Sequence, residues 1–185
     1  SSFEEVTKQQ FRDALKKLEK EGEKSLIIDL RNNGGGLLST AVDMLDRLLP
    51  KGTLVYTKDK NGEKEVYSAT DEESFDKPVA ILVNENSASA SEVFSGAMQD
   101  YKKAVLVGNT TFGKGIVQTV FDLPDGTALK LTTSKYYTPK GRNIHGTGLE
   151  PDISVALDET TYTQKKSGLT IDNQMERAVE YLLNK

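Results

Sequence analysis

The chain alternates between stretches of helical and strand-like hydrophobic periodicity, and this alternation predicts its elements. Apolar residues at helical spacing predict four helices, at 7–22, 41–49, 90–100 and 172–182. Short apolar runs predict buried strands at 25–30, 79–83 and 104–107. Two hairpins are predicted around the turns Asn61-Gly62 and Pro124-Asp125-Gly126. Strands that alternate with helices in this way are typical of an α/β fold.

Two details of these elements are specific enough to be compared with a structure. Thr7, followed by Gln10, predicts a capping box at the start of the first helix, and Gly22 predicts its end. In the second hairpin, Leu129 and Leu131 alternate with polar residues. This period of two predicts that one face of the hairpin is more buried than the other.

The stretch 84–118 carries the candidate chemistry. The apolar run 79–83 leads into the small residues 87–91 and then into a helical pattern. A strand that turns into a helix at small residues presents one side chain outward and leaves free backbone N–H groups at the helix start. We place Ser89 at this turn. Lys114 lies between Gly113 and Gly115, and these glycines let the backbone approach another segment closely.

A serine becomes an effective nucleophile when a base removes its proton. The chain has no cysteine, which excludes a thiol nucleophile, and its one histidine, His145, is expected in a surface loop. Lysine can serve as the base when burial lowers its pKa, as in known serine–lysine pairs. The hypothesis is that Ser89 is the nucleophile and Lys114 its base. If Lys114 opens a strand, Gln118 lies on the same face and can orient the lysine.

Each of these residues also has a structural explanation. Ser89 can simply permit a tight strand-to-helix junction, because serine-rich turns are common. Lys114 can be a solvated loop lysine, and Gln118 a polar residue on an exposed strand face. Asp29 and Arg31 can form a structural ion pair at the base of the loop that follows.

Three glycines, 34–36, lie between a predicted strand and a predicted helix. Such a loop can bind phosphate, but the glycine spacing of the known phosphate-binding motifs is absent. We favour an oxyanion hole, in which exposed backbone N–H groups stabilise negative charge on a carbonyl oxygen, each by about 3–4 kcal/mol. Which of Gly34, Gly35 and Gly36 donates stays open at this point.

Several motifs resemble those of the carboxyl-terminal processing peptidases, or tail-specific proteases, of peptidase family S41. They are the glycine loop 26–36, the serine-rich turn 87–92, the segment 111–118 and the later segments 129–141 and 148–152. The resemblance implies Ser89, Lys114 and Gln118 as the catalytic set and the backbone N–H groups of Gly35 and Ala90 as the oxyanion hole. It also implies a ClpP/crotonase-like β-superhelix of mixed strands and helices with peripheral hairpins.

The same resemblance implies a serine-type peptidase that cleaves near the C-terminal tails of unfolded or partly disordered proteins, without a metal or cofactor. Residues 1–185 correspond to the catalytic core, and the family's PDZ domain and N-terminal targeting segment are expected in the full-length protein. An extracytoplasmic location is implied, in the periplasm, at the cell wall or at the membrane. Two alternatives are a resting core that needs the PDZ domain for activity and a non-catalytic, ligand-binding relative of the fold.

Composition narrows the expected partners. A chain of 185 residues has the length of one domain with a sizeable core. Charged residues make up 28% and the net charge is −4, which gives no reason to expect nucleic acid or an anionic membrane surface as a partner. No apolar run approaches the length of a membrane-spanning helix. The family resemblance, not the composition, implies a polypeptide substrate as the partner.

Overall fold

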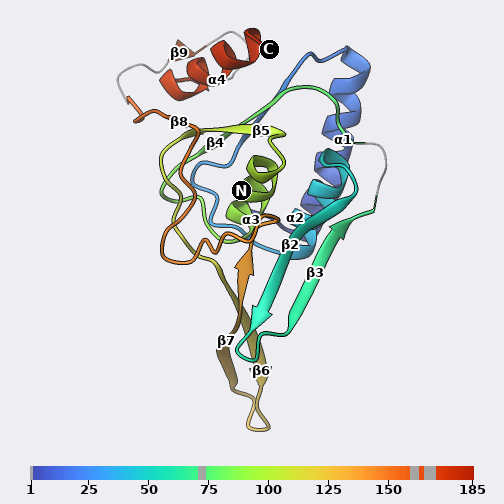
Figure 1. The fold of residues 1–185 in the computed structure, drawn as a ribbon, viewed down its shortest axis with the longest axis vertical. Coiled ribbons are helices and arrows are strands. Elements are labelled where there is room, and N and C mark those ends of the chain that lie inside the picture. Colours follow the sequence, from blue (N-terminus) through green and yellow to red (C-terminus); the bar gives the residue numbers. More distant parts are fainter. Residues whose placement is uncertain (1, 71–73, 159–162, 165–169) are drawn as a thin grey trace.

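The computed structural model describes residues 2–70, 74–158, 163–164 and 170–185 of the chain. Helices and strands are interspersed along it (Figure 1). The helices are α1 (Glu5–Glu21), α2 (Leu38–Leu48), α3 (Ala90–Asp100) and α4 (Asn173–Leu183). The strands are β1 (Leu26–Asp29), β2 (Gly52–Asp59), β3 (Lys64–Ala69), β4 (Val79–Val83), β5 (Ala104–Gly108), β6 (Ile116–Asp122), β7 (Ala128–Tyr137), β8 (Ile153–Ser154), β9 (Thr163–Gln164) and β10 (Thr170–Ile171). None of the described helices is long and apolar enough to cross a membrane.

A parallel sheet with the strand order β1-β4-β5-β8 forms the centre of the fold. The strands predicted at 25–30, 79–83 and 104–107 are confirmed as β1, β4 and β5. From β4 the chain passes through α3 and returns as β5. The segment that carries Ser89 therefore begins at the carboxyl end of a central strand.

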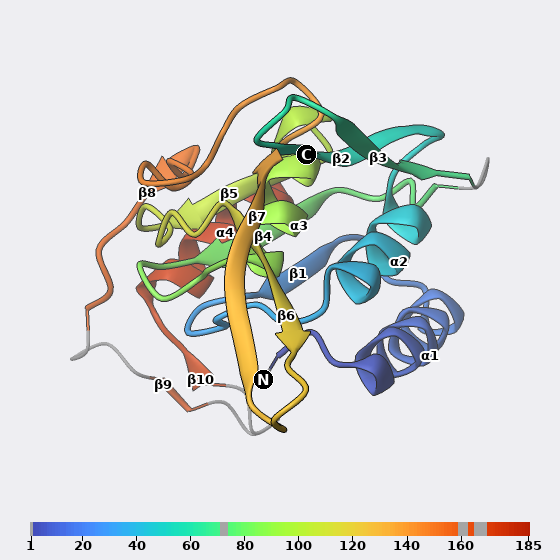
Figure 2. The same cartoon turned by 90° about the horizontal axis from the view of Figure 1, so that it is seen from below.

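Strand β4 is buried on both faces, which explains its uninterrupted apolar sequence. Val79, Ile81 and Val83 pack into a core with residues of α1, α2 and α3. Ala80 and Leu82 point the other way and pack into a second core with α4. Figure 2 shows α4 on the opposite side of the sheet from α1 and α2. The four predicted helices are thus confirmed, and together they cover both faces of the sheet.

Helix α1 begins earlier than its sequence pattern predicts. Its N-cap is Glu4, and Thr7 lies inside the first turn, where its Oγ1 accepts the Glu4 N–H at 3.1 Å. The predicted N-cap at Thr7 is therefore wrong. The cause is tertiary, because Phe3 forms a β-bridge with Gly36 and fixes the chain just before the helix. The predicted end is confirmed by Gly22, which has the left-handed φ of 75° that favours glycine.

An antiparallel sheet with the strand order β3-β2-β7-β6 is built from the two predicted hairpins. The hairpin β2–β3 turns at Asn61-Gly62 and the hairpin β6–β7 at residues 123–127, as predicted. The hairpin β6–β7 projects from the rest of the molecule: it points downward in Figure 1 and toward the viewer in Figure 2.

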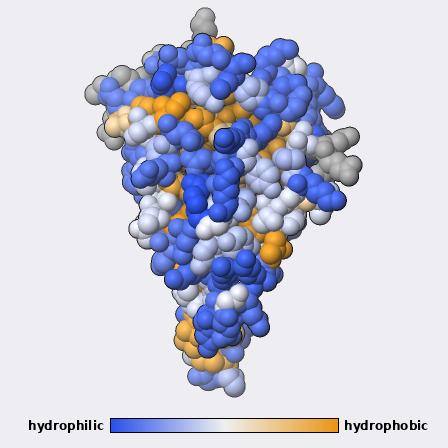
Figure 3. All heavy atoms as spheres, in the orientation of Figure 1, coloured by the Kyte–Doolittle hydropathy of each residue, from blue (hydrophilic) through white to orange (hydrophobic). Residues whose placement is uncertain are grey.

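The prediction that one face of the hairpin β6–β7 is buried is wrong for its outer half. Leu129 and Leu131 are 46% and 45% exposed, and all residues from 128 to 132 are exposed. Apolar and polar residues do alternate here, but this part of the hairpin extends beyond the core, and none of the described residues covers its apolar face. Figure 3 shows the resulting apolar patch at the narrow end of the molecule. The exposed apolar residues of the hairpin and its turn are Val120, Phe121, Leu123, Leu129 and Leu131. The strand pairing places Phe121, Leu129 and Leu131 on one face and Val120 on the other.

Candidate active site

Three serines lie on the segment around the start of α3, and one of them is accessible. Ser87 and Ser91 are fully buried, at 0% exposure. Their hydroxyl groups donate to backbone carbonyls of the loop after β1, from Ser87 to Leu30 at 2.8 Å and from Ser91 to Asn33 at 2.9 Å. Ser89 is half-buried. It is therefore the serine of this segment whose side chain is available to a substrate.

Ser89 occupies the predicted strand-to-helix junction. It is the N-cap of α3, with φ 56° and ψ −117°. A positive φ costs a residue other than glycine about 1–3 kcal/mol, and such strain is common where a side chain is presented for function. The junction thus turns Ser89 outward while the residues on either side, Ala88 and Ala90, remain buried.

Glu92 is a fully buried carboxylate. It joins the junction at Ser89 to the segment 111–114 that carries Lys114. Its Oε1 accepts hydrogen bonds from Thr111 Oγ1 at 2.6 Å and from the Gly113 N–H at 2.7 Å. Its Oε2 accepts the N–H groups of Lys114 at 2.7 Å and of Ser89 at 3.0 Å. Charge-assisted bonds of this kind fix geometry strongly. Glu92 is absent from the predicted site, although the spacing Ser89-x-x-Glu92 is that of a capping box and could have identified it.

The glycine loop touches the junction at Gly35. A Cβ added to Gly35 would lie 2.8 Å from both the Ala90 nitrogen and the Ser89 Cβ, closer than real Cβ contacts allow. Gly35 also has a φ of 99°, which favours glycine. A Cβ added to Gly34 would meet no atom within 4 Å. Among the three glycines, Gly35 is thus the one that fits closely against Ser89 and Ala90.

Hydrogen bonds hold the glycine loop from two sides. On one side, the Phe3 N–H donates to the Gly35 carbonyl at 2.9 Å. On the other, the Asn32 N–H donates to Asn84 Oδ1 at 2.9 Å, and Asn84 Nδ2 donates back to Asn32 Oδ1 at 3.0 Å. The loop is therefore tied directly to the segment that leads to Ser89.

The two predicted donors of the oxyanion hole, the N–H groups of Gly35 and Ala90, differ in their hydrogen-bond acceptors. The N–H of Ala90, at the first position of α3, donates to no protein group among the residues described. The N–H of Gly35 donates to Oδ1 of Asn33 at 3.0 Å. A substrate oxygen bound at Gly35 must therefore share this N–H with Asn33 or replace it. The role of both N–H groups in an oxyanion hole stays a prediction.

Lys114 is attached to the site through its backbone. Gly113 and Gly115 let its loop pack closely against the segment 144–148, as expected: a Cβ on Gly115 would lie 2.6 Å from the His145 nitrogen. The Lys114 side chain is half-buried. Within the described part of the chain, no hydrogen bond joins Lys114 Nζ to Ser89 Oγ. The pairing of these two side chains stays a prediction.

Gln118 lies on β6 and is exposed. Strand β6 begins at Ile116, so Lys114 precedes the strand rather than opening it. The premise that placed Lys114 and Gln118 on one strand face is therefore wrong. An orienting role for Gln118 stays a prediction that rests on the motif.

The expected ion pair between Asp29 and Arg31 is present, with 2.7 Å between Oδ2 and Nη2. Arg31 also pairs with Asp172 at 2.6 Å. Burial opposes the positive charge, but the hydrogen bonds to Asp29 and Asp172 outweigh it and raise the pKa of Arg31. His145 is exposed, as expected of a surface loop residue.

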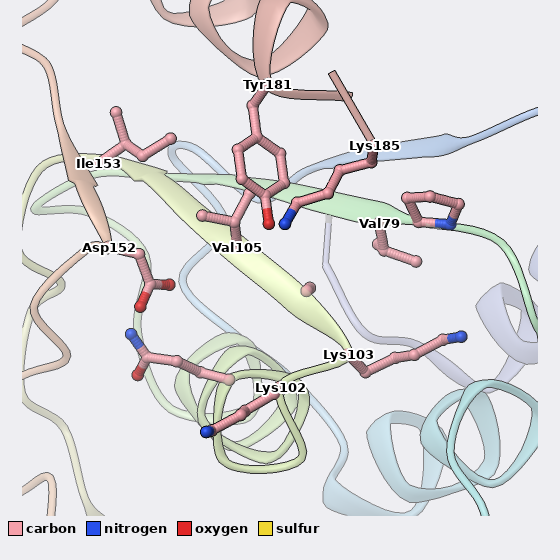
Figure 4. A pocket seen from close by; sticks show the side chains of 11 residues that line it. Val79, Lys102, Lys103, Val105, Asp152, Ile153, Tyr181 and Lys185 are labelled. Carbon is pink, nitrogen blue, oxygen red and sulfur yellow. The ribbon is translucent and has the colours of Figure 1, made fainter. Parts of the chain in front are cut away.

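A separate pocket of about 590 Å³ lies at the other end of the central strands (Figure 4). Lys102, Lys103 and Lys185 surround it, together with Asp152 and Tyr181. It is lined by the first residues of β4 and β5, whereas Ser89 follows the carboxyl end of β4, so it is not part of this site. The part of the chain with described structure contains no group of three or more His, Cys, Asp or Glu residues that could hold a metal ion.

A half-exposed serine at a strained strand-to-helix junction, beside a glycine loop in an α/β core, is an arrangement compatible with a serine nucleophile. The comparison with known families agrees with it. The chain belongs to peptidase family S41, whose family model matches residues 1–155.

The similarity extends to individual relatives. The chain is 43% identical over 161 residues to the carboxyl-terminal-processing protease of Synechocystis sp., a match that covers 87% of this chain and 38% of that protein. It is 46% identical over 159 residues to a probable CtpA-like serine protease of Staphylococcus haemolyticus, covering 84% and 32%. The solved structure of a photosystem II D1 C-terminal processing protease has a TM-score of 0.81 and 39% identity, covering 90% of this chain and 43% of that one. The chain thus spans well under half the length of these relatives.

Proposed function

We propose that residues 1–185 are the catalytic core of a serine-type peptidase with Ser89 as nucleophile and Lys114 as base. The observation that carries the proposal is the attachment of both residues to the Glu92 carboxylate, with Gly35 in contact with the same junction. Membership of peptidase family S41 and the names of the relatives support hydrolysis of peptide bonds near C-terminal tails.

In the proposed reaction, neutral Lys114 takes the proton of the Ser89 hydroxyl and the serine oxygen attacks the scissile carbonyl carbon. The N–H groups of Gly35 and Ala90 stabilise the oxyanion, each by about 3–4 kcal/mol. Lys114 then gives the proton to the leaving amine, and water hydrolyses the acyl-enzyme. Gln118 orients the lysine. No step uses His145.

The proposed substrate is the C-terminal region of an unfolded or partly disordered protein. Such a segment can be bound as an added strand, because β6 is one of the two edge strands of its sheet. The relatives are two to three times longer than the matched segment, and we assign the PDZ domain and an extracytoplasmic targeting segment to the full-length protein.

A second candidate is a resting core that becomes active when another part of the protein rearranges it. Two observations favour it: the Gly35 N–H is occupied by Asn33, and the described hydrogen bonds include none between the side chains of Ser89 and Lys114. In this state the nucleophile is in place but its base is not yet engaged.

The proposal is tested by incubating the chain with casein and identifying the products by mass spectrometry. Wild type is compared with Ser89→Ala and Lys114→Ala, and with the matched controls Ser39→Ala and Lys130→Ala at exposed positions. We expect cleavage by wild type and both controls, and none by the two site variants.

Equal cleavage by wild type and Ser89→Ala would contradict the proposed nucleophile. Absence of cleavage by wild type would contradict independent activity of residues 1–185 and favour the resting core. In that case, the full-length protein with the same Ser89→Ala control decides whether the site is catalytic.

A further inference from the structure

Arg31 begins the glycine loop and is half-buried between β1 and the start of α4. Its side chain is 12% exposed. Nε and Nη2 donate to the Asp29 carboxylate at 3.0 and 2.7 Å. Nη1 donates to Asp172 Oδ2 at 2.6 Å and to Gln174 Oε1 at 2.9 Å. One guanidinium group therefore connects the end of β1 to the first turn of α4.

The residues that α4 contributes are themselves held in place. Asp172 has a side chain 5% exposed, and its second oxygen, Oδ1, caps the helix by accepting the Met175 N–H at 2.9 Å. Gln174 is 1% exposed, and its Nε2 donates to the Val155 carbonyl at 2.7 Å. Both side chains are thus buried with all their polar atoms paired, which gives the guanidinium group a fixed partner rather than a mobile one.

The position of Arg31 affects the site because few residues separate it from Gly35. Asn33, two residues on, accepts the Ala88 N–H at 3.1 Å through its carbonyl and the Gly35 N–H at 3.0 Å through its side chain. A displacement of Arg31 would therefore also displace the Gly35 N–H and Ala88, the residue before Ser89. Displacements of about 1 Å at such distances from the reacting atoms can reduce rates about a hundredfold.

We propose that Asp172 and Gln174 are positioning residues, which act through Arg31 to hold the glycine loop against Ser89. This inference rests on the proposed peptidase function. Helix α4 lies beyond residues 1–155, the part matched by the family model. It follows that in this chain the support of the active site extends past the family domain into α4.

The first test is Asp172→Asn, because asparagine can still cap the helix but lacks the charge and the second carboxylate oxygen. We expect kcat for casein-derived peptides to fall about tenfold to a hundredfold with little change in KM. Gln174→Met, which removes the acceptor without altering charge, should reduce kcat in the same direction. The matched control is Glu176→Gln, on the exposed face of the same turn, which should retain wild-type kinetics.

A double-mutant cycle separates positioning from simple stabilisation of α4. In an Arg31→Met background, Asp172→Asn should reduce kcat no further, because the residue through which it acts is gone. Reductions that multiply, or an unchanged kcat in folded Asp172→Asn and Gln174→Met, would overturn the inference.

The positioning role can also be measured without catalytic activity, so this test does not depend on the proposed function. Amide hydrogen exchange at Gly35 should be faster in Asp172→Asn and Gln174→Met than in wild type and Glu176→Gln. Unchanged exchange at Gly35 would overturn the inference even in an active enzyme. If wild type cleaves nothing but exchange at Gly35 is still faster in the two variants than in wild type, the positioning is supported while the peptidase assignment fails.

Discussion

Ser89 and Lys114 donate their backbone N–H groups to one atom, Oε2 of Glu92. The two residues come from different elements, the start of α3 and the loop before β6, which are also joined by the Phe112 N–H donating to the Ser87 carbonyl at 3.0 Å. The buried carboxylate therefore helps to set the separation of the proposed nucleophile and base. It holds both residues through their backbone N–H groups.

Glu92→Gln should destabilise the protein and reduce its activity. A glutamine has one acceptor oxygen in place of two and would place its NH₂ group against backbone donors, so two buried N–H groups lose their acceptor. We expect the free energy of unfolding in urea to fall by about 2–3 kcal/mol. The exposed control Glu150→Gln should change it by less than about 0.5 kcal/mol. Equal stability of the two variants would refute the bridging role of Glu92.

Gly35→Ala and Gly34→Ala should differ sharply. At Gly35, the methyl group would overlap Ala88 O at 2.6 Å and the backbone conformation is left-handed, so we expect a loss of about 1–3 kcal/mol and of casein cleavage. At Gly34 a Cβ meets nothing within 4 Å, so Gly34→Ala should leave stability unchanged or raise it by up to about 1 kcal/mol. Urea unfolding and the cleavage assay measure both; similar behaviour of the two variants would contradict the assignment.

Thr111 offers a test of the hydrogen-bond network with little change in shape. Its hydroxyl donates to Glu92 at 2.6 Å and accepts the Leu149 N–H at 2.8 Å. Thr111→Val removes both bonds and should cost about 1–3 kcal/mol of unfolding free energy. Thr111→Ser keeps the hydroxyl and loses one methyl group, at about 1 kcal/mol. If the serine variant were the less stable of the two, packing rather than hydrogen bonding would dominate at this position.

Stability should decrease in alkaline solution because of two tyrosines in the antiparallel sheet. Burial, together with the neighbouring Glu65, raises the pKa of Tyr67 to about 12, and burial raises the pKa of Tyr136. An unfolded tyrosine ionises near pH 10, so this contribution to stability is complete below about pH 10 and is lost as the pH rises toward about 12.

Urea unfolding at several pH values between 8 and 11, chosen to span about one unit on either side of the unfolded tyrosine pKa, measures this effect. The variant with both Tyr67→Phe and Tyr136→Phe should lose less stability than wild type over the range. A decline of the same size in both proteins would assign it to other groups. Rates of cleavage should be compared below the upper end of this pH range, because activity lost there reflects unfolding.

Features that depend on neighbouring residues were predictable from the sequence. The small residues after an apolar run predict the junction at Ser89, and Asp172 is the N-cap of α4 because its side chain accepts an N–H three residues on. The parallel strands follow from their uninterrupted apolar runs, since both faces of the central strand β4 are buried.

Features that depend on distant segments were not predictable. The capping-box spacing could indicate the bond from Ser89 to Glu92, but Glu92 also bonds to residues about twenty positions away, and Arg31 bonds to Asp172 across 141 positions. No local pattern signals a contact at these distances. The predicted start of α1 was wrong for the same reason, because a β-bridge from Phe3 to Gly36 determines where the helix begins. The buried face predicted for the hairpin β6–β7 failed because alternation indicates which residues share a face, but not whether anything covers it.

The projecting hairpin differs from the core in how readily it unfolds. Strand β4 and helix α3 lie in the core, whereas residues 128–132 of the hairpin are exposed on both faces. Segments with few buried apolar contacts unfold locally at a lower free energy than the whole protein. Ser89 belongs to the core, and Lys114 precedes β6, the first strand of the hairpin. The outer part of the hairpin should therefore unfold locally at a temperature below that of global unfolding, while the core that holds Ser89 stays folded.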